Sequence, residues 1–161
     1  LSVDFWQQTF ELGAKYGAKP VGLAARDTLR VEMKYPLYGH EINDDTNPYE
    51  AGLGWVVKPQ AKDFLGKEKM LSGKEAGLKR KLIGFKLLER GVPREGYALF
   101  SFDNIEIGKV TSGTMSPSLG EGIGVGYVDV NYAKEGTEIL LDIRGRKFKA
   151  KVVKTPFVTK N

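Results

Sequence analysis

Few side chains in this sequence stand in a pattern that could carry out chemistry. The chain has one histidine, His40, and no cysteine, which excludes thiol nucleophiles, thiolate metal sites and disulfides. A Ser-His-Asp triad cannot be recognised from spacing alone, and a single loop histidine is more often solvated or held by a structural contact. We therefore predict no catalytic residue from this pattern.

Two further patterns superficially resemble ligand sites. Asp44 and Asp45 could bind a hard cation, but the spacing of a calcium loop is absent and the segment favours a turn. The alternating glycines of residues 122–126 stand in a strand pattern with no helix after them. Without a helix N-terminus to receive phosphate, a dinucleotide loop is rejected. We predict no metal site.

Arg26 is more informative because of its place in a predicted helix. It falls in the first turn, where the helix macrodipole disfavours a cation by roughly 0.3–1 kcal/mol. A locally disfavoured charge is sometimes kept for function, and the alternative is an ion pair with Asp27 or Glu32. Tyr35, which precedes Pro36, has a structural alternative as a half-buried loop aromatic.

Two helices are predicted to position these residues. Residues 2–17 are amphipathic, with Ser2 as the N-cap and a glycine at the end. The next helix carries Ala25, Leu29 and Met33 at four-residue spacing and must end before Pro36. Both residues of interest therefore belong to the second helix or to its C-terminal end.

The segment after these helices contains a loop and two short elements. Residues 36–50 are rich in turn formers and predict a surface loop. Residues 53–57 form an apolar run that predicts a short buried strand, and Asp63 is expected to cap a helix that ends at Leu71 before Gly73. We predict a junction at residues 73–81.

From Lys81 onward the hydrophobic period changes from helical to two, which is typical of a small antiparallel barrel or sandwich. The clearest prediction is a hairpin in which 139–143 pairs with 148–153 through a turn containing Gly145. The predicted strands are 82–87, 97–100, 105–111, 124–128, 139–143 and 148–153. Helices followed by strands give an α+β fold class.

Composition and charge limit the partners. The apolar fraction of 41% is that of an ordinary globular protein, and no apolar run approaches the roughly 20 residues of a membrane-spanning helix. We predict a cytoplasmic protein with no membrane partner. The net charge of +5 favours an anionic partner, such as nucleic acid, an acidic protein or a small polyanion, or serves solubility. Because the sequence begins at Leu1 and enters a predicted helix at once, we expect it to be a fragment or a processed piece of a protein.

Seven ordered segments resemble one protein family over essentially the whole chain. The longest reads G-L-A-A-R-D-T-L-R-V-E-M-K-Y-P-L-Y-G-H-E-I at 22–42. The others are Y-E-A-G-L-G-W-V-V-K at 49–58, D-F-L-G at 63–66, G-V-P-R-E-G-Y at 91–97, G-K-V-T-S-G-T-M-S-P-S-L at 108–119, G-V-G-Y-V at 124–128 and P-F-V at 156–158. In this order they resemble the C-terminal portion of glycine-cleavage T-proteins.

The resemblance implies a fold and an activity. Residues 1–72 would be the C-terminal portion of a ferredoxin-like folate-binding region, and 73–161 a C-terminal Greek-key β-barrel. The family's enzymes are aminomethyltransferases that act in glycine catabolism. They move the aminomethyl carbon from the lipoyl arm of H-protein to tetrahydrofolate, giving methylenetetrahydrofolate and ammonia.

The resemblance also implies which residues contact the cofactor. Arg26 matches the family's folate-binding arginine and Tyr35 a tyrosine of the folate site, while Arg94 is a candidate for reaching the glutamate tail. A guanidinium offers a planar fork to a carboxylate or a pterin edge, and a tyrosine ring offers a stacking face.

One departure from the family limits the activity of the chain. The family's acid/base aspartate and its pterin-binding glutamate lie in an N-terminal half that this sequence does not contain. A placed carboxylate is typically worth roughly 10²–10⁴-fold in rate, so we expect a poor catalyst alone, with the N-terminal half and lipoylated H-protein as partners.

Three alternatives stay open. They are a non-catalytic folate-binding module, like the relatives that assist iron–sulfur protein maturation, a module that docks H-protein, and a basic barrel that binds nucleic acid. The G-H-E-I and S-P-S-L blocks favour the T-proteins over those relatives. The barrel lacks the interleaved aromatic and basic residues of a nucleic-acid platform, so we predict no nucleic acid as partner.

Overall fold

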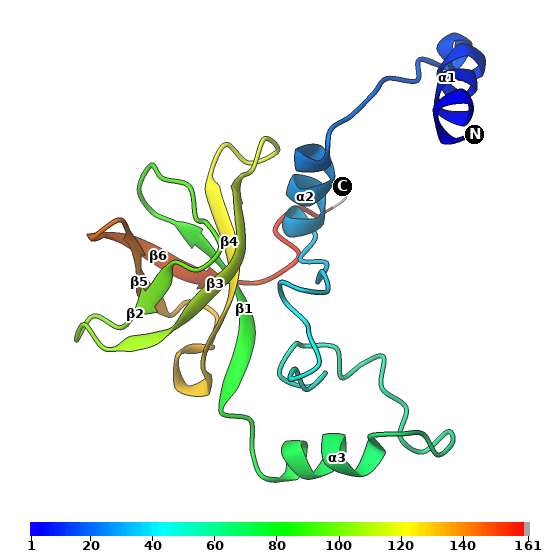
Figure 1. The fold of residues 1–161 in the computed structure, drawn as a ribbon. Helices are drawn as coiled ribbons and strands as arrows, with labels where there is room; N and C mark the ends of the chain where they lie inside the picture. Colours follow the sequence, from blue (N-terminus) through cyan, green and yellow to red (C-terminus); the bar gives the residue numbers. More distant parts are fainter. Residues whose placement is uncertain (160–161) are drawn as a thin grey trace.

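Six antiparallel strands close into a barrel in the computed structural model, which describes residues 1–159 (Figure 1). The strands follow one another around the barrel in the order β1-β4-β3-β2-β5-β6. The first strand thus lies beside the fourth, as in a Greek key. Their bounds are Arg80–Leu87 (β1), Ala98–Phe100 (β2), Glu106–Met115 (β3), Gly122–Asp129 (β4), Glu138–Ile143 (β5) and Arg146–Val153 (β6).

Alternate apolar residues of the strands fill the barrel interior, to which β4 contributes Val128. Ile139 and Leu141 of β5 pair with Ala150 and Phe148 of β6, which confirms the predicted hairpin. Arg144 and Gly145 both have positive φ, 55° and 84°, as a two-residue hairpin turn requires. The interior is filled by Ile83, Phe85, Leu87, Leu99, Ile107, Val110, Val128, Ile139, Leu141, Ala150 and Val152.

All six predicted strands are confirmed, with ends that differ by a few residues. β3 runs four residues beyond its prediction, through Met115, because it pairs with β4 as far as Gly122. β4 is buried at every position from Gly122 to Val128, so both its faces are covered. The second cover comes from outside the barrel, where Val31 packs with Leu82, Ile123, Val125 and Tyr127.

Helix α2, Leu23–Glu32, supplies this outer cover and lies against β3 and β4 (Figure 1). It ends at Glu32, with Met33 as its C-cap, and so stops before Pro36 as predicted. Helix α1, Ser2–Gly13, and the short η1, Ala14–Tyr16, match the predicted first helix. Ser2 is not its N-cap, because the helix already includes Ser2 and Leu1 holds the capping position.

Unlike α2, helix α1 does not pack against the barrel of the described chain, residues 1–159. None of its residues is buried, and it stands away from the barrel at the end of an extended connection (Figure 1). Its apolar side chains face outward, among them Val3, Phe5, Trp6 and Leu12. Within the described chain, α1 is therefore an amphipathic helix without the surface that its pattern calls for.

Two predictions between residues 50 and 75 are wrong. The predicted strand 53–57 is a series of turns, in which Leu53 N donates to Pro48 O and Val56 N to Leu53 O. No strand among residues 1–159 pairs with it. Helix α3 spans Lys67–Glu75, so Asp63 does not cap it and Gly73 lies inside it. It stops before Gly77, which takes a φ of 85°.

The remaining elements complete an α+β fold. A short η2, Val130–Tyr132, follows β4. Within residues 1–72 the structure has helices, turns and one isolated bridge, Tyr38 to Ile42, and no strand. The predicted division between residues 72 and 73 falls inside α3, and it stays a prediction. No helix of residues 1–159 is both long and apolar enough to cross a membrane.

Candidate functional site

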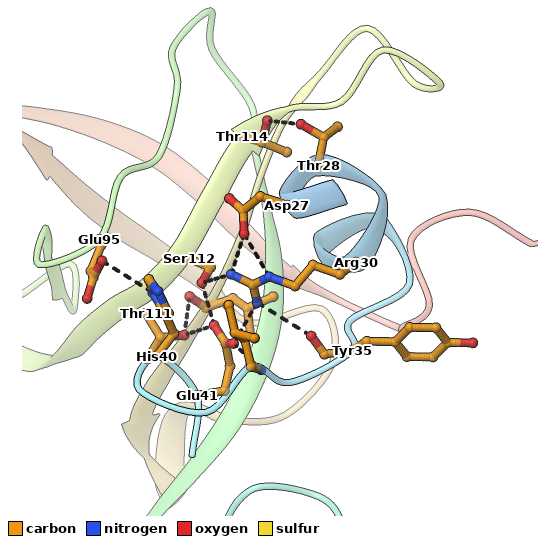
Figure 2. Close-up of polar contacts among 12 residues, drawn as sticks. Asp27, Thr28, Arg30, Tyr35, His40, Glu41, Glu95, Thr111, Ser112 and Thr114 are labelled. Atoms are coloured by element: carbon orange, nitrogen blue, oxygen red, sulfur yellow. Dashed lines mark hydrogen bonds and ion pairs between the residues drawn. The ribbon is translucent and has the colours of Figure 1, made fainter. Parts of the chain in front are cut away.

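A buried arginine joins α2 to the barrel. The side chain of Arg30 is 8% exposed, and its guanidinium donates to three side chains (Figure 2). Nε donates to Asp27 Oδ1 at 2.7 Å, Nη1 to Glu41 Oε2 at 2.6 Å and Nη2 to Ser112 Oγ at 2.8 Å. Nη1 also lies 3.4 Å from the carbonyl oxygen of Tyr35. The guanidinium therefore connects α2, the following loop and β3.

Glu41 is the counterpart of this arginine and is 2% exposed. Its carboxylate accepts from the backbone N–H of Leu37 at 2.9 Å, from Thr111 Oγ1 at 2.8 Å and from Ser112 Oγ. The Tyr127 hydroxyl donates to the Glu41 carbonyl at 2.8 Å. A buried ion pair is tolerated when such hydrogen bonds satisfy its remaining atoms, and this pair meets that condition.

A second buried carboxylate secures the C-terminal end of α2. Glu32 accepts hydrogen bonds from the hydroxyls of Ser116 and Ser118 and from the backbone N–H of Ser118. Its carbonyl accepts from Phe157 N at 2.9 Å. The loop after β3 and the segment after β6 are thus tied to the same helix end.

Lys34 fixes the chain immediately before Tyr35. It adopts a positive φ of 52°, and its Nζ donates to the Leu82 carbonyl of β1 at 3.0 Å. Burial lowers the pKa of Lys34, and the nearby charge of Lys81 lowers it further. The turn that follows α2 is therefore anchored to the barrel by a side chain that the sequence analysis did not single out.

The predicted contact Arg26 lies on the exposed surface of α2. It makes no hydrogen bond or ion pair with any other residue in the described part of the chain. The alternative reading, an ion pair with Asp27 or Glu32, is wrong because Asp27 pairs with Arg30 and Glu32 binds Ser116. Its guanidinium is therefore available to a ligand.

Tyr35 lies one turn beyond the end of α2 and is 61% exposed. Its ring points away from the buried network while its carbonyl faces Arg30 (Figure 2). The alternative of a half-buried aromatic does not fit this exposure. Arg94 is exposed in the loop between β1 and β2, and no polar contact joins it to Arg26 or Tyr35 within residues 1–159.

His40 and the acidic pair at 44–45 each make polar contacts with other residues of the chain. His40 Nδ1 lies 3.3 Å from Glu95 Oε2. Asp44 and Asp45 form a turn in which Asp45 N donates to Asn43 Oδ1 at 3.0 Å. Asp44 Oδ1 accepts from the Tyr38 hydroxyl at 2.8 Å. Residues 1–159 contain no group of three or more metal-ligating side chains.

A cavity of about 390 Å³ lies between the 40–46 loop and strands β3 and β4. Tyr127 lines it, and Arg80 lies with its guanidinium 4.5 Å from the centre of that ring. Glu50 holds Arg80 from the other side through two hydrogen bonds, which raise the pKa of Arg80. Burial, followed by the charge of Glu50, raises the pKa of Tyr127 to about 12.

Two family models match most of the chain. The glycine cleavage T-protein C-terminal barrel domain matches residues 80–159, and the GCVT N-terminal domain matches residues 2–61. The aminomethyltransferase of Bdellovibrio bacteriovorus is 67% identical over 159 residues, which cover 99% of this chain and 44% of that protein. The aminomethyltransferase of Bacteroides thetaiotaomicron is 54% identical over 153 residues, covering 94% of this chain and 42% of that protein.

Comparison with solved structures indicates the same family. The crystal structure of the glycine cleavage system aminomethyltransferase T from Bartonella henselae matches with a TM-score of 0.88 and 36% identity, covering 94% of this chain and 43% of that one. The chain belongs to the glycine-cleavage T-protein family and corresponds to a segment that includes the C-terminal barrel domain. It spans less than half the length of the curated relatives it matches.

Sequence reasoning missed the residues that form the joint between α2 and the barrel, namely Arg30, Glu32 and Glu41. All three lie inside the longest block that resembles the family, and their partners Ser112, Ser116 and Ser118 lie in the G-K-V-T-S-G-T-M-S-P-S-L block. The sequence offered one signal, which is that both blocks belong to the resemblance and carry charged or hydroxyl side chains. Their mutual contact required the fold.

Proposed function

We propose that this chain is the part of a tetrahydrofolate-dependent aminomethyltransferase that supplies the barrel and part of the folate-binding surface. The observation that carries the proposal is the exposed guanidinium of Arg26, free of any partner in residues 1–159, on a helix that buried contacts fix to the barrel. A free cation on a rigid support is suited to an anionic ligand, because little freedom is lost on binding.

The available side chains fit a folate. Arg26 would bind a carboxylate or the pterin edge through its planar fork, and the exposed ring of Tyr35 would stack on an aromatic ring. Arg94 would reach the glutamate tail. Tetrahydrofolate supplies the nitrogen that accepts the aminomethyl carbon, and these three residues would bind and orient it.

The proton transfer of the reaction requires another part of the protein. We assign no catalytic residue to this chain, because the buried carboxylates Glu32 and Glu41 are fully engaged in structural contacts. The acid/base residue would come from the N-terminal half of a T-protein, and the aminomethyl group from lipoylated H-protein. The cytoplasm is the compartment that we propose, with neither nucleic acid nor membrane as partner.

Helix α1 supports a complementary N-terminal half as partner. Phe5 and Leu12 are each 72% exposed, and Trp6 is 56% exposed. An isolated helix of 12 residues is marginal in water, since most helical stability comes from packing of the apolar face. We propose that the N-terminal half covers this face. The division of the chain between residues 72 and 73 stays part of the same proposal.

A complementation assay tests the proposal. The chain is mixed with the remainder of the Bdellovibrio bacteriovorus aminomethyltransferase, and methylenetetrahydrofolate formation from aminomethylated H-protein is followed. We expect turnover only from the mixture. Arg26→Ala should weaken tetrahydrofolate binding about tenfold or more, the equivalent of one charged hydrogen bond. Arg90→Ala, an exposed arginine of the barrel, is the matched control.

Two results would contradict the proposal. Equal tetrahydrofolate affinity in Arg26→Ala and in the unmodified chain would remove Arg26 from the site. Tetrahydrofolate binding by the mixture without any transfer would instead favour a non-catalytic folate-binding module.

A further inference from the structure

Both the side chain and the backbone of Arg30 contact the backbone of Tyr35. The Arg30 guanidinium Nη1 lies 3.4 Å from the Tyr35 carbonyl, and Tyr35 N donates to the Arg30 carbonyl at 2.8 Å. Arg30 also lies four residues after Arg26, on the next turn of α2. In the sequence, the buried Arg30 therefore lies between the two candidate folate contacts, Arg26 and Tyr35.

The same guanidinium is tied to the barrel. It donates to Ser112 on β3 at 2.8 Å and to Glu41 at 2.6 Å. Glu41 accepts from Thr111, also on β3, and from Leu37 N, two residues after Tyr35 (Figure 2). Strand β3 pairs with β2 on one side and with β4 on the other, and both α2 and the 35–41 segment are hydrogen-bonded to it.

We propose that Arg30 and Glu41 form a positioning pair for the folate contacts, a proposal that rests on the proposed function of Arg26 and Tyr35. Arg30 is 8% and Glu41 2% exposed, so both are enclosed by protein and act through other residues. A guanidinium donates in fixed directions within one plane, which sets the orientation of every group it binds. The pair therefore fixes the Tyr35 backbone relative to the helix that carries Arg26.

A purely structural role is the alternative that the test must separate. Removing one member of a buried ion pair leaves the other charge unpaired and is strongly destabilising, whereas replacing both members by apolar residues of similar volume is often neutral. The double variant Arg30→Met/Glu41→Leu should therefore lose less stability than either single substitution, because it leaves neither member of the pair as an unpaired buried charge. It cannot reproduce the directional hydrogen bonds to Tyr35, Leu37 and Ser112.

The experiment compares the whole chain with this double variant, with Arg30→Lys and with Arg90→Met as the matched exposed control. Hydrogen exchange is measured at the amides of residues 35–41 and of β1, and tetrahydrofolate binding by titration. In the double variant we expect the 35–41 amides to exchange about tenfold faster, β1 amides to be unchanged and tetrahydrofolate affinity to fall about tenfold.

Arg30→Lys and Arg90→Met serve as an intermediate variant and a control. Arg30→Lys keeps a charge for Glu41 but lacks the planar fork, so its affinity should lie between those of the unmodified chain and the double variant. Arg90→Met should match the unmodified chain in both measurements.

Two outcomes would overturn the positioning pair. One is unchanged exchange at residues 35–41 in the double variant, and the other is faster exchange with undiminished tetrahydrofolate affinity. Absence of tetrahydrofolate binding both by the unmodified chain and by its mixture with the N-terminal remainder contradicts the proposed function instead. The exchange rates would then decide alone whether the pair holds the 35–41 segment.

Discussion

Tyr127 permits a quantitative test of how the 33–46 segment is attached to the barrel. Its side chain is 8% exposed on β4, and its hydroxyl donates to the Glu41 carbonyl at 2.8 Å. Tyr127→Phe removes this hydroxyl and keeps the ring. Near neutral pH we expect a loss of about 1–2 kcal/mol in the free energy of unfolding, which is within the range of about 1–3 kcal/mol for a buried acceptor left without its donor.

The pH dependence of this difference follows from the tyrosine pKa. Burial raises the pKa of Tyr127 from 10.0 to about 12. The native state therefore holds the phenolic proton more tightly than the unfolded chain does. The stabilisation is fully present below pH 10 and is lost as the pH rises from 10 to 12. Each pKa unit corresponds to about 1.4 kcal/mol, so about 3 kcal/mol is lost in all and about 2 kcal/mol by about pH 11.5.

Urea unfolding followed by circular dichroism measures both effects. The unmodified chain and Tyr127→Phe are compared at several pH values between 7 and 11.5, so that lysines titrating in both proteins cancel in the difference. The advantage of the tyrosine should shrink above pH 10 and disappear or reverse near pH 11.5. Tyr16→Phe, an exposed tyrosine of η1, should give no difference at any pH. A Tyr127→Phe difference that stays constant across this range would refute the reasoning.

Two further substitutions test the core and the joint by the same unfolding assay. Leu141→Ala, at a fully buried position of the barrel interior, should cost about 2–5 kcal/mol. The half-buried neighbour Leu140→Ala should cost clearly less, and equal losses would contradict the assignment of the core. Glu32→Gln removes the charge that accepts from Ser118 and should cost about 1.5–3 kcal/mol. The exposed Glu68→Gln is its control, and a Glu32→Gln loss as small as that of the control would exclude a stabilising joint.

The strands could be predicted because each carries its own signal. Alternation in 139–143 and 148–153, with a glycine turn between them, determines a hairpin locally. Closure of the barrel could not be predicted in this way, and a sandwich remained possible. It depends on the pairing of β1 with β6, in which Phe85 lies opposite Val152. No local pattern encodes a contact between residues so far apart.

The wrong strand at 53–57 has a different cause. Apolar composition indicated burial of that run, yet Trp55 and Val56 are exposed and the backbone closes local turns. Gly52 takes a φ of 75°, and the Tyr49 ring lies against Gly54, both of which suit turns rather than a strand. Apolar residues in a chain that spans less than half of its relatives need not be covered by the chain itself.

The alternative of an ion pair between Arg26 and Asp27 fails for a geometric reason. Residues i and i+1 of a helix do not face each other, whereas residues i and i+3 do. Asp27 therefore pairs with Arg30, at 2.6 Å. The spacing rule alone would have favoured this pair. The contacts of Arg30 with Glu41 and Ser112 required the three-dimensional structure.

The buried contacts between α2 and the barrel give a structural reason for two of the sequence blocks that resemble the family. Glu41 of the G-H-E-I block and Ser116 and Ser118 of the S-P-S-L block are engaged in holding α2 on the barrel. A chain could match these blocks because it needs the joint, whether or not it binds a folate. Arg26 makes no hydrogen bond or ion pair within residues 1–159, so no polar contact of the described fold requires an arginine there. The identity of that residue bears on ligand binding, whereas the identities at 30, 32 and 41 bear first on assembly. Binding measurements on Arg26 and unfolding measurements on Glu32 therefore address separate properties of the same helix.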